Sequence, residues 1–320
     1  MIAVHGGVGF RDDRRLSVAC ADAVRNCNDV VEAVSFLEDN ALFNCGYGSN
    51  PTMSGTVECE AGFMSSEGFR FGAVGAVTRL QNPCQVAKAI AYADDYKGLV
   101  RPMALVGVGA EQWAEERGFP LVDPEAMITN KTTEVWKKAR AALDVLESLE
   151  DFKMDTVGAV SITEDAVEAC TSSGGIMLKT PGRLGHCTAF GSGMWAERRG
   201  DRSIAVSVSG CGEALSRANF SRSLAVRLLE RGGDELPSTV ITSFFECDFL
   251  GSSFMSTIAS NRMYAGGLVM LQEEGSAYEL IIFHNTPVFP FAYCRGSAVR
   301  KGLSQLPVGH SILVESYTSK

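Results

Sequence analysis

The chain has 320 residues, 46% of them hydrophobic and 21% charged, which is typical of a folded globular protein and excludes extensive disorder. The net charge of −9 excludes a nonspecific nucleic-acid binder, because such a protein needs a basic surface. The chain has no run of about 18 uninterrupted apolar residues and no basic and apolar leader at its start, so we expect an intracellular protein, nuclear or cytoplasmic, without a membrane partner.

The first part of the chain combines short apolar strands with amphipathic helices. A strand at Ile2–Val4 leads into the glycine-rich segment "HGGVGF", and apolar residues from Leu16 to Val34 then recur at the three- and four-residue steps of a helix. Helical spacing returns from Val135 to Leu149, and the acidic segment "ESLEDFKM" at its end is expected to be exposed. Between these helices we expect strands at Val57–Met64, Phe69–Val77 and Met103–Val106 and helices at Pro83–Asp94 and Gly109–Gly118.

The second part opens with a predicted hairpin. Val157–Ile162 is expected to pair with Ala166–Ser172, and the glycine-rich segment "SSGGIMLKTPGRLGH" follows. No linker rich in proline, glycine and serine divides the chain, so we predict one layered α+β domain over residues 1–320. The remaining expected elements are a strand at Ile204–Val208, a helix from "SGCGE" to about Arg231, a helix at Ser238–Phe249, and strands at Ala265–Gln272 and Tyr278–Phe283.

Neither a metal nor an organic cofactor is expected. The ten cysteines are scattered singly without a CxxC pair, and the four histidines show no metal-ligand spacing. We therefore interpret the cysteines as reduced and mostly buried thiols.

The segment "KMDTVGAVSI" places Thr156 between a charged stretch and an apolar strand. A threonine hydroxyl is a weak nucleophile that needs a base, and a threonine at the start of a chain can use its own α-amino group, whose pKa of about 7.7–8.0 leaves part of it neutral near pH 7. This chemistry requires that the Asp155–Thr156 bond is cut first. Taken alone, Thr156 is more simply a strand-forming residue, so the interpretation depends on the motifs around it.

Several motifs occur together in a fixed order: "VHGGVG", "FNCGYGSN", "DTVGAV", "SSGG", "PGRLG" and "SGCGE". In this order they resemble the plant-type asparaginase family of N-terminal-nucleophile hydrolases, and within it the taspase branch of threonine aspartases. The resemblance implies a four-layer αββα sandwich made as an inactive precursor. Self-cleavage at Asp155–Thr156 would give an α subunit of residues 1–155 and a β subunit of residues 156–320, held together as a heterodimer that can pair further.

The resemblance also implies roles for residues around the nucleophile. Thr156 matches the nucleophile and, through its amine, the base. Ser173 matches a second hydroxyl that orients the nucleophile, with Ser172 as the alternative because the hairpin is one residue shorter than expected. Ser209 and the backbone N–H of Gly210 match the groups that stabilise the oxyanion. Asn44 matches a residue that supports this region, and Gly7 and Gly9 match a loop whose backbone approaches the site.

Substrate binding is implied for a second set of residues. Arg183 matches the arginine that grips the substrate carboxylate, which its planar fork suits. His186 stands where asparaginases carry an aspartate that binds the α-ammonium of a free amino acid, and a histidine supplies no fixed negative charge there. Cys211 agrees with the taspase branch, and Arg14, with Arg15 as the alternative, is expected to assist with acidic substrates.

The expected activity is therefore that of a threonine endopeptidase that cuts protein substrates after aspartate. The resemblance suggests nuclear regulatory proteins as its partners. The alternative is an isoaspartyl peptidase or L-asparaginase of the same family, and a third hypothesis is a relative that keeps the fold without activity. Turnover of free asparagine or of a β-aspartyl dipeptide separates the first two.

Overall fold

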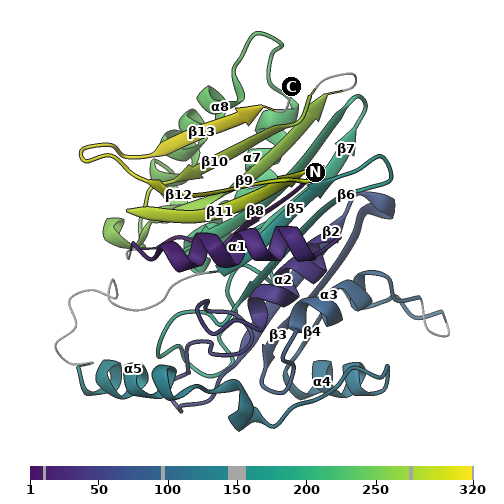
Figure 1. The fold of residues 1–320 in the computed structure, drawn as a ribbon, viewed down its shortest axis with the longest axis vertical. Coiled ribbons are helices and arrows are strands. Elements are labelled where there is room, and N and C mark those ends of the chain that lie inside the picture. The colour runs from purple at the N-terminus through teal and green to yellow at the C-terminus, as the bar shows by residue number, and fades with distance from the viewer. Residues whose placement is uncertain (10–11, 95–97, 143–155, 274–276, 319–320) are drawn as a thin grey trace.

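The computed structural model describes residues 1–9, 12–94, 98–142, 156–273 and 277–318, and Figure 1 shows their arrangement. Two β-sheets lie face to face, and helices cover the outer face of each sheet. In the view of Figure 1, α1 to α3 cross in front of the larger sheet and α7 and α8 lie behind the smaller one. This arrangement confirms the predicted four-layer αββα sandwich.

The larger sheet has eight strands in the order β12-β11-β1-β5-β6-β2-β3-β4. Neighbouring strands are antiparallel except for β3 and β4. The central strand β5 lies between β1 and β6, so segments before and after residue 155 alternate within one sheet. The strands are β1 (Ile2–His5), β2 (Cys59–Ser65), β3 (Arg70–Val77), β4 (Ala104–Val106), β5 (Thr156–Ile162), β6 (Val167–Ser173), β11 (Val288–Arg295) and β12 (Ala298–Gln305).

The smaller sheet has five strands in the order β13-β10-β9-β8-β7, all antiparallel. Its strands β7, β8 and β9 face β5, β6 and β2 of the larger sheet. They are β7 (Met194–Arg199), β8 (Arg202–Gly210), β9 (Ala265–Glu273), β10 (Glu279–His284) and β13 (Leu313–Thr318).

Helices α1 to α4 pack on the larger sheet, whereas α7 packs on β7 and β8 and α8 on β13. Within the described ranges, no helix has the length and apolarity that a membrane crossing requires. The α-helices are α1 (Arg14–Asn26), α2 (Val30–Glu38), α3 (Pro83–Ala91), α4 (Gly107–Glu115), α5 (Asn130–Ala141), α6 (Gly212–Ala218), α7 (Phe220–Leu229) and α8 (Pro237–Ser243). The shorter elements are η1 (Glu67–Phe69), η2 (Pro124–Met127), the π-helix η3 (Phe244–Leu250), η4 (Ser253–Met255) and η5 (Ser260–Arg262).

Two helices that were predicted as continuous are each divided in two. The helix expected from Leu16 to Val34 breaks before Asp29, whose carboxylate accepts hydrogen bonds from the backbone N–H groups of Val31 and Glu32 and so begins α2. The helix after "SGCGE" breaks at Asn219, which adopts a left-handed conformation with φ of 45°. Residues 143–149 of the helix expected to end at Leu149 lie outside the described residues.

The core consists of two apolar layers, and strand β5 contributes alternate residues to each. Val160 and Ile162 point into the layer between the two sheets, whereas Val157 and Ala159 point into the layer under the helices. All seven residues of β5 are buried, because both faces of the larger sheet are covered at its centre. The two-residue period of the strand therefore decides which side chains meet the smaller sheet.

Candidate active site

Strand periodicity places Thr156 and Ser173 on the same face of the larger sheet. Thr156 begins β5 and lies directly opposite Ser173, the last residue of β6. In each strand, every second residue faces the smaller sheet, and Thr156 and Ser173 are among these residues. Ser172, the alternative to Ser173, pairs with Val157 and points to the opposite face, where its buried Oγ has no hydrogen-bond partner among the described residues.

The hydroxyl and the backbone nitrogen of Thr156 each have a serine partner. Thr156 Oγ1 donates a hydrogen bond to Ser173 Oγ at 3.2 Å, and Ser173 Oγ in turn accepts one from the Gly175 N–H at 3.0 Å. The Thr156 N–H donates to Ser209 Oγ at 3.1 Å. Thr156, Ser173 and Ser209 are at most 3% exposed, so the three groups lie in a water-poor environment.

The loop after β1 contacts Ser209 through the backbone of Val8. The Val8 N–H donates to Ser209 Oγ at 3.1 Å, which fixes the serine from the side of the larger sheet. Gly9, which is expected near the substrate, exchanges two backbone hydrogen bonds with Val288 at the start of β11. Gly7, which precedes Val8 in this loop, has φ of 95°, a conformation that glycine adopts without steric strain.

Gly210 ends β8 in a close approach to the neighbouring strand. A Cβ atom at this position would lie 2.4 Å from the carbonyl oxygen of Tyr264, so no larger residue fits without a shift of the backbone. Cys211, the next residue, donates its backbone N–H to the same carbonyl at 3.0 Å and precedes α6. Burial raises the pKa of the Cys211 thiol, so it is protonated at neutral pH.

Asn44 braces the loop that follows Ser173. The side-chain Nδ2 of Asn44 donates to the Gly175 carbonyl at 2.8 Å, and the side-chain Oδ1 accepts from the Asn50 N–H at 2.8 Å. The backbone carbonyl of Asn44 accepts from the Gly174 N–H at 2.8 Å. The side chain is fully buried. Asn44 therefore holds the backbone of the loop that follows Ser173.

Arg183 lies in the long loop between β6 and β7 and forms a bidentate ion pair. Its Nε and Nη2 donate to the two carboxylate oxygens of Glu213 at 2.9 and 2.8 Å. Burial alone would raise the pKa of Glu213, but the hydrogen bonds and charge of Arg183 outweigh it and lower that pKa. Glu213 is part of "SGCGE" but was not assigned a role from the sequence. A substrate carboxylate that binds Arg183 has to share its guanidinium with Glu213.

His186 is a neutral, buried histidine in the same loop. Its side chain forms a hydrogen bond of 3.1 Å between Nε2 and the Val208 carbonyl, which can only accept, so Nε2 carries the hydrogen. The residue is 2% exposed, and burial lowers its pKa. The position therefore carries no negative charge of its own.

A second buried histidine was not predicted at the site. His5 ends β1 opposite Gly158, and its Nε2 forms a hydrogen bond of 2.9 Å with Ser207 Oγ across the two sheets. Burial is the main cause that lowers the pKa of His5 to about 3, and the nearby His186 is a smaller cause in the same direction. The signal in the sequence was its place in "VHGGVG", which we interpreted as a loop motif.

The structure does not join Arg14 to this group. Arg14 is exposed at the first residue of α1, and within the described part of the chain its side chain makes no hydrogen bond or ion pair with the site. Arg15, the alternative, pairs with Asp13 at 2.6 Å. Asp155, the predicted residue before the cleaved bond, lies outside the described residues.

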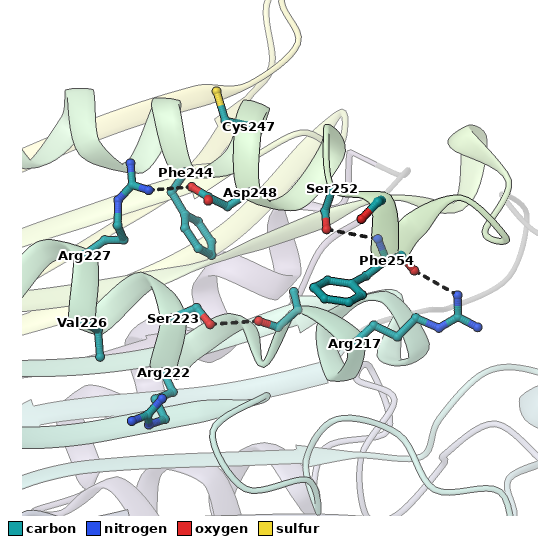
Figure 2. Close-up of a pocket in the computed structure, with 12 residues that line it drawn as sticks. Arg217, Arg222, Ser223, Val226, Arg227, Phe244, Cys247, Asp248, Ser252 and Phe254 are labelled. Atoms are coloured by element: carbon teal, nitrogen blue, oxygen red, sulfur yellow. Dashed lines mark hydrogen bonds and ion pairs between the residues drawn. The ribbon is translucent and has the colours of Figure 1, made fainter.

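A cavity of about 610 Å³ lies elsewhere, between α6, α7 and the segment from η3 to η4 (Figure 2). Its lining includes three arginines, of which Arg217 donates to the Phe254 carbonyl and Arg227 pairs with Asp248. It contains none of the residues predicted for catalysis or substrate binding, and its arginines serve local contacts.

Comparison with known proteins gives matches over most of the chain. The sequence profile of a family described as asparaginase matches residues 17–277. The chain is 33% identical over 247 residues to an isoaspartyl peptidase/L-asparaginase from Danio rerio, which covers 72% of this chain and 76% of that protein. It is 34% identical over 253 residues to a plant-type L-asparaginase from Pyrobaculum calidifontis, with 73% and 81% covered. It is 30% identical over 302 residues to an isoaspartyl peptidase from Escherichia coli, with 86% and 88% covered.

Proposed function

The chain belongs to the asparaginase family of N-terminal-nucleophile hydrolases, and from this premise we propose that Thr156 is its nucleophile, released by self-cleavage of the Asp155–Thr156 bond. The observation that supports this most directly is the arrangement of Thr156, whose hydroxyl points to Ser173 and whose nitrogen points to Ser209. The substrate is an amide of an aspartyl or asparaginyl residue.

Self-cleavage uses the groups that already contact Thr156. The Thr156 hydroxyl attacks the carbonyl carbon of residue 155, the peptide C–N bond breaks, and the acyl group moves to the threonine oxygen. Water then hydrolyses this ester, which leaves a carboxyl group on residue 155 and a free amine on Thr156. Ser173 polarises the hydroxyl through the 3.2 Å hydrogen bond between the two side chains.

Turnover of a substrate repeats the attack with the new amine as the base. The amine takes the hydroxyl proton as Thr156 Oγ1 attacks the substrate carbonyl. The substrate C–N bond then breaks, the leaving nitrogen takes that proton, and water hydrolyses the ester on Thr156. Ser209 Oγ already accepts hydrogen bonds from two backbone N–H groups, those of Thr156 and Val8. A serine hydroxyl has two acceptor sites and one donor, so its hydrogen is left to bind the oxyanion. One such donor contributes about 2.7–4 kcal/mol in comparable sites.

Arg183 binds the carboxylate of the substrate in this proposal. Its guanidinium offers the planar fork that a carboxylate needs, and its side chain is only 14% exposed, which limits competition from water. Glu213 binds the Nε and Nη2 edge of this guanidinium before substrate arrives, so the substrate carboxylate competes with Glu213 for Arg183.

The relatives' names favour one substrate class. They are isoaspartyl peptidases and L-asparaginases, and this supports hydrolysis of free asparagine or of β-aspartyl dipeptides better than it supports cleavage of proteins.

One observation favours the second candidate, an endopeptidase that cuts proteins after aspartate. His186 is buried, neutral and hydrogen-bonded to the backbone, so it offers no negative charge to the α-ammonium of a free amino acid. An aspartyl residue inside a polypeptide has no such ammonium. In this case the partners of the enzyme are proteins with exposed aspartates, and the resemblance to the taspase branch points to nuclear regulatory proteins.

A release assay separates the candidates. The mature enzyme is given free asparagine, a β-aspartyl dipeptide and a set of peptides with an internal aspartate, and products are measured by mass. Release of ammonia or free aspartate supports the first candidate, and cleavage of internal aspartyl bonds supports the second. If the chain neither cuts itself nor acts on any of these substrates, the proposal of a threonine hydrolase is wrong.

A further inference from the structure

Three buried side chains of different chemistry converge beside Arg183. Glu60 comes from β2, and His186 and Cys187 come from the loop after Arg183. One ligand atom of each, a carboxylate oxygen, a ring nitrogen and the sulfur, lies within 4.8 Å of the other two. Glu60 and His186 are 2% exposed and Cys187 is fully buried. We propose that Glu60, His186 and Cys187 form a zinc-binding site that regulates the enzyme.

The donor set matches the chemistry of zinc. Thiolate sulfur, imidazole nitrogen and carboxylate oxygen are the protein ligands that Zn²⁺ takes, and three of them leave a fourth position for water. In a tetrahedral site such atoms are about 3.4–3.6 Å apart, given metal–ligand distances of about 2.0–2.3 Å. The three atoms lie within 4.8 Å of one another, so their separations have to contract by up to about 1.4 Å. Rotation of the side chains of Glu60 and Cys187 supplies such a movement.

The histidine is already in the form that binds a metal. Because the Val208 carbonyl accepts a hydrogen bond from Nε2, the lone pair of the neutral ring is on Nδ1. Metal-binding histidines commonly donate their other ring N–H to a carbonyl in this way, which fixes the tautomer and the orientation of the ring. This contact is independent of the clustering of the three ligands and points to the same use.

The charges of the site also balance. Zinc binding converts the Cys187 thiol to a zinc-bound thiolate and releases its proton to solvent. The thiolate and the Glu60 carboxylate then neutralise the two positive charges of the metal. This compensation is needed because Arg183 and Lys179 lie close by and would repel a bare cation.

The bound metal acts on the substrate site through Glu60 and the loop. The Glu60 carboxylate accepts a hydrogen bond from the Gly185 N–H, and a Cβ on Gly185 would lie 2.3 Å from Glu60 Oε1 and 3.0 Å from Arg183 Nη1. Glu60 and Arg183 therefore converge on one glycine of the loop. Zinc withdraws Glu60 from this contact and shifts Arg183, so it lowers turnover. This second step rests on the proposed function, whereas zinc binding does not.

Metal binding is tested without any activity measurement. Metal-free protein is titrated with Co²⁺, followed by its absorption, and with Zn²⁺ in competition with a chromophoric chelator. We expect one equivalent to bind, with thiolate-to-cobalt charge-transfer absorption. Cys187→Ser should lose that absorption, and both Cys187→Ser and His186→Gln should weaken zinc binding by more than about tenfold. Cys247→Ser, which removes an exposed thiol, serves as the matched control and should bind as the wild type does.

The outcomes divide clearly. Absence of thiolate-to-cobalt absorption in the wild type, or equal zinc affinity of the wild type and both site variants, overturns the proposal. If Cys187→Ser does not fold, as judged by circular dichroism, His186→Gln and Glu60→Gln carry the comparison. Zinc should inhibit turnover by the wild type and should inhibit Cys187→Ser at least about tenfold less. Binding without inhibition overturns the regulatory role, and binding by a protein without any turnover leaves the zinc site intact while the proposed function fails.

Discussion

At the residue scale, the site depends on partners that are far apart in the sequence. Arg183 was recognised from the motif around it, but Glu213, which holds its guanidinium in two hydrogen bonds, is 30 residues away. His5 and Ser207 are 202 residues apart and meet only because two sheets pack face to face. Motifs indicate candidate residues for the chemistry, whereas the partners that orient these residues depend on the packing.

Removal of the Glu213 carboxylate should improve substrate binding. Glu213 occupies the guanidinium fork of Arg183, so Glu213→Gln leaves the fork free for the substrate carboxylate. The Glu213 side chain is 51% exposed, and such pairs contribute up to about 1 kcal/mol, so we expect KM to fall by up to about fivefold. Steady-state kinetics check this, with Arg183→Ala as the control that raises KM. An unchanged or higher KM for Glu213→Gln would show that the carboxylate does not compete.

Burial of neutral His5 should make stability depend on pH. Its pKa is about 3 in the folded chain and about 6.5 when unfolded, so between these values the unfolded chain binds the extra proton. Stability from this group is therefore present above pH 6.5 and is lost as the pH falls. Two proteins are compared, Thr156→Ala alone and Thr156→Ala with His5→Asn, and neither can cut itself. The protein that keeps His5 should have the larger free energy of unfolding above pH 6.5, and this difference should shrink by up to about 1.4 kcal/mol per pH unit below 6.5. Urea unfolding at several pH values measures this difference in the free energy of unfolding. A difference that does not change with pH would contradict the interpretation of His5 as a buried neutral histidine.

At the element scale, strand periodicity made much of the site predictable. The hairpin of β5 and β6 was expected at nearly its observed bounds, and its pairing selects Ser173 over Ser172. Strands β7, β11, β12 and β13 were not predicted. β12 and β13 alternate weakly and are only partly buried at sheet edges, so their pattern resembles that of a surface loop. The division of the first helix at Asp29 was missed because apolar spacing continues across it.

The two neighbouring serines of β6 give a matched test of this periodicity. Ser173→Ala removes the hydroxyl that contacts Thr156 Oγ1, so we expect self-cleavage to slow by about a hundredfold. Ser172→Ala removes a hydroxyl on the opposite face and should cleave at nearly the rate of the wild type. A time course of intact mass after synthesis measures both rates. Equal rates for the two variants would show that Ser173 does not act on the nucleophile.

The close packing of β5 on the smaller sheet predicts that it tolerates no added methyl group. A Cβ on Gly158 would lie 2.0 Å from Ser207 Oγ and 2.6 Å from His5 Nε2. We expect Gly158→Ala to lower the free energy of unfolding by about 1–3 kcal/mol. Gly109→Ala in α4 meets nothing within 4 Å and serves as the control, which should be neutral or slightly stabilising. Urea unfolding of both variants, each made in the Thr156→Ala background, measures their free energies of unfolding. Equal stabilities would argue against a tight interface between the two sheets.

At the scale of the whole molecule, the four layers were predicted from the family resemblance rather than from periodicity. Periodicity alone indicated a layered α+β fold, because it does not state which sheet a strand joins. The structure adds that β5 lies between β1 and β6 and that β6 also pairs with β2. The segments on either side of the predicted cut are therefore joined by backbone hydrogen bonds along several strands.

Self-cleavage should therefore divide the chain without dividing the molecule. We expect the wild type to give two pieces, residues 1–155 and 156–320, that elute together from a sizing column and separate only in denaturant. Thr156→Ala should remain one chain with the same elution volume, because it lacks the nucleophile but keeps the fold. Mass measurement with sequencing of the new N-terminus checks the position of the cut. An uncut wild type, or a cut elsewhere, would contradict the proposal.

If the chain is cut before Thr156 as proposed, the central place of β5 has a consequence for the lifetime of the mature protein. Before the cut, an unfolded molecule is one chain, and its refolding does not depend on concentration. After the cut, each unfolding event releases two chains that have to find each other again in dilute solution. Reassembly then slows as the protein is diluted, so the lifetime of the mature protein is set by its rate of unfolding. Only the uncut precursor can refold in a reaction that involves a single chain.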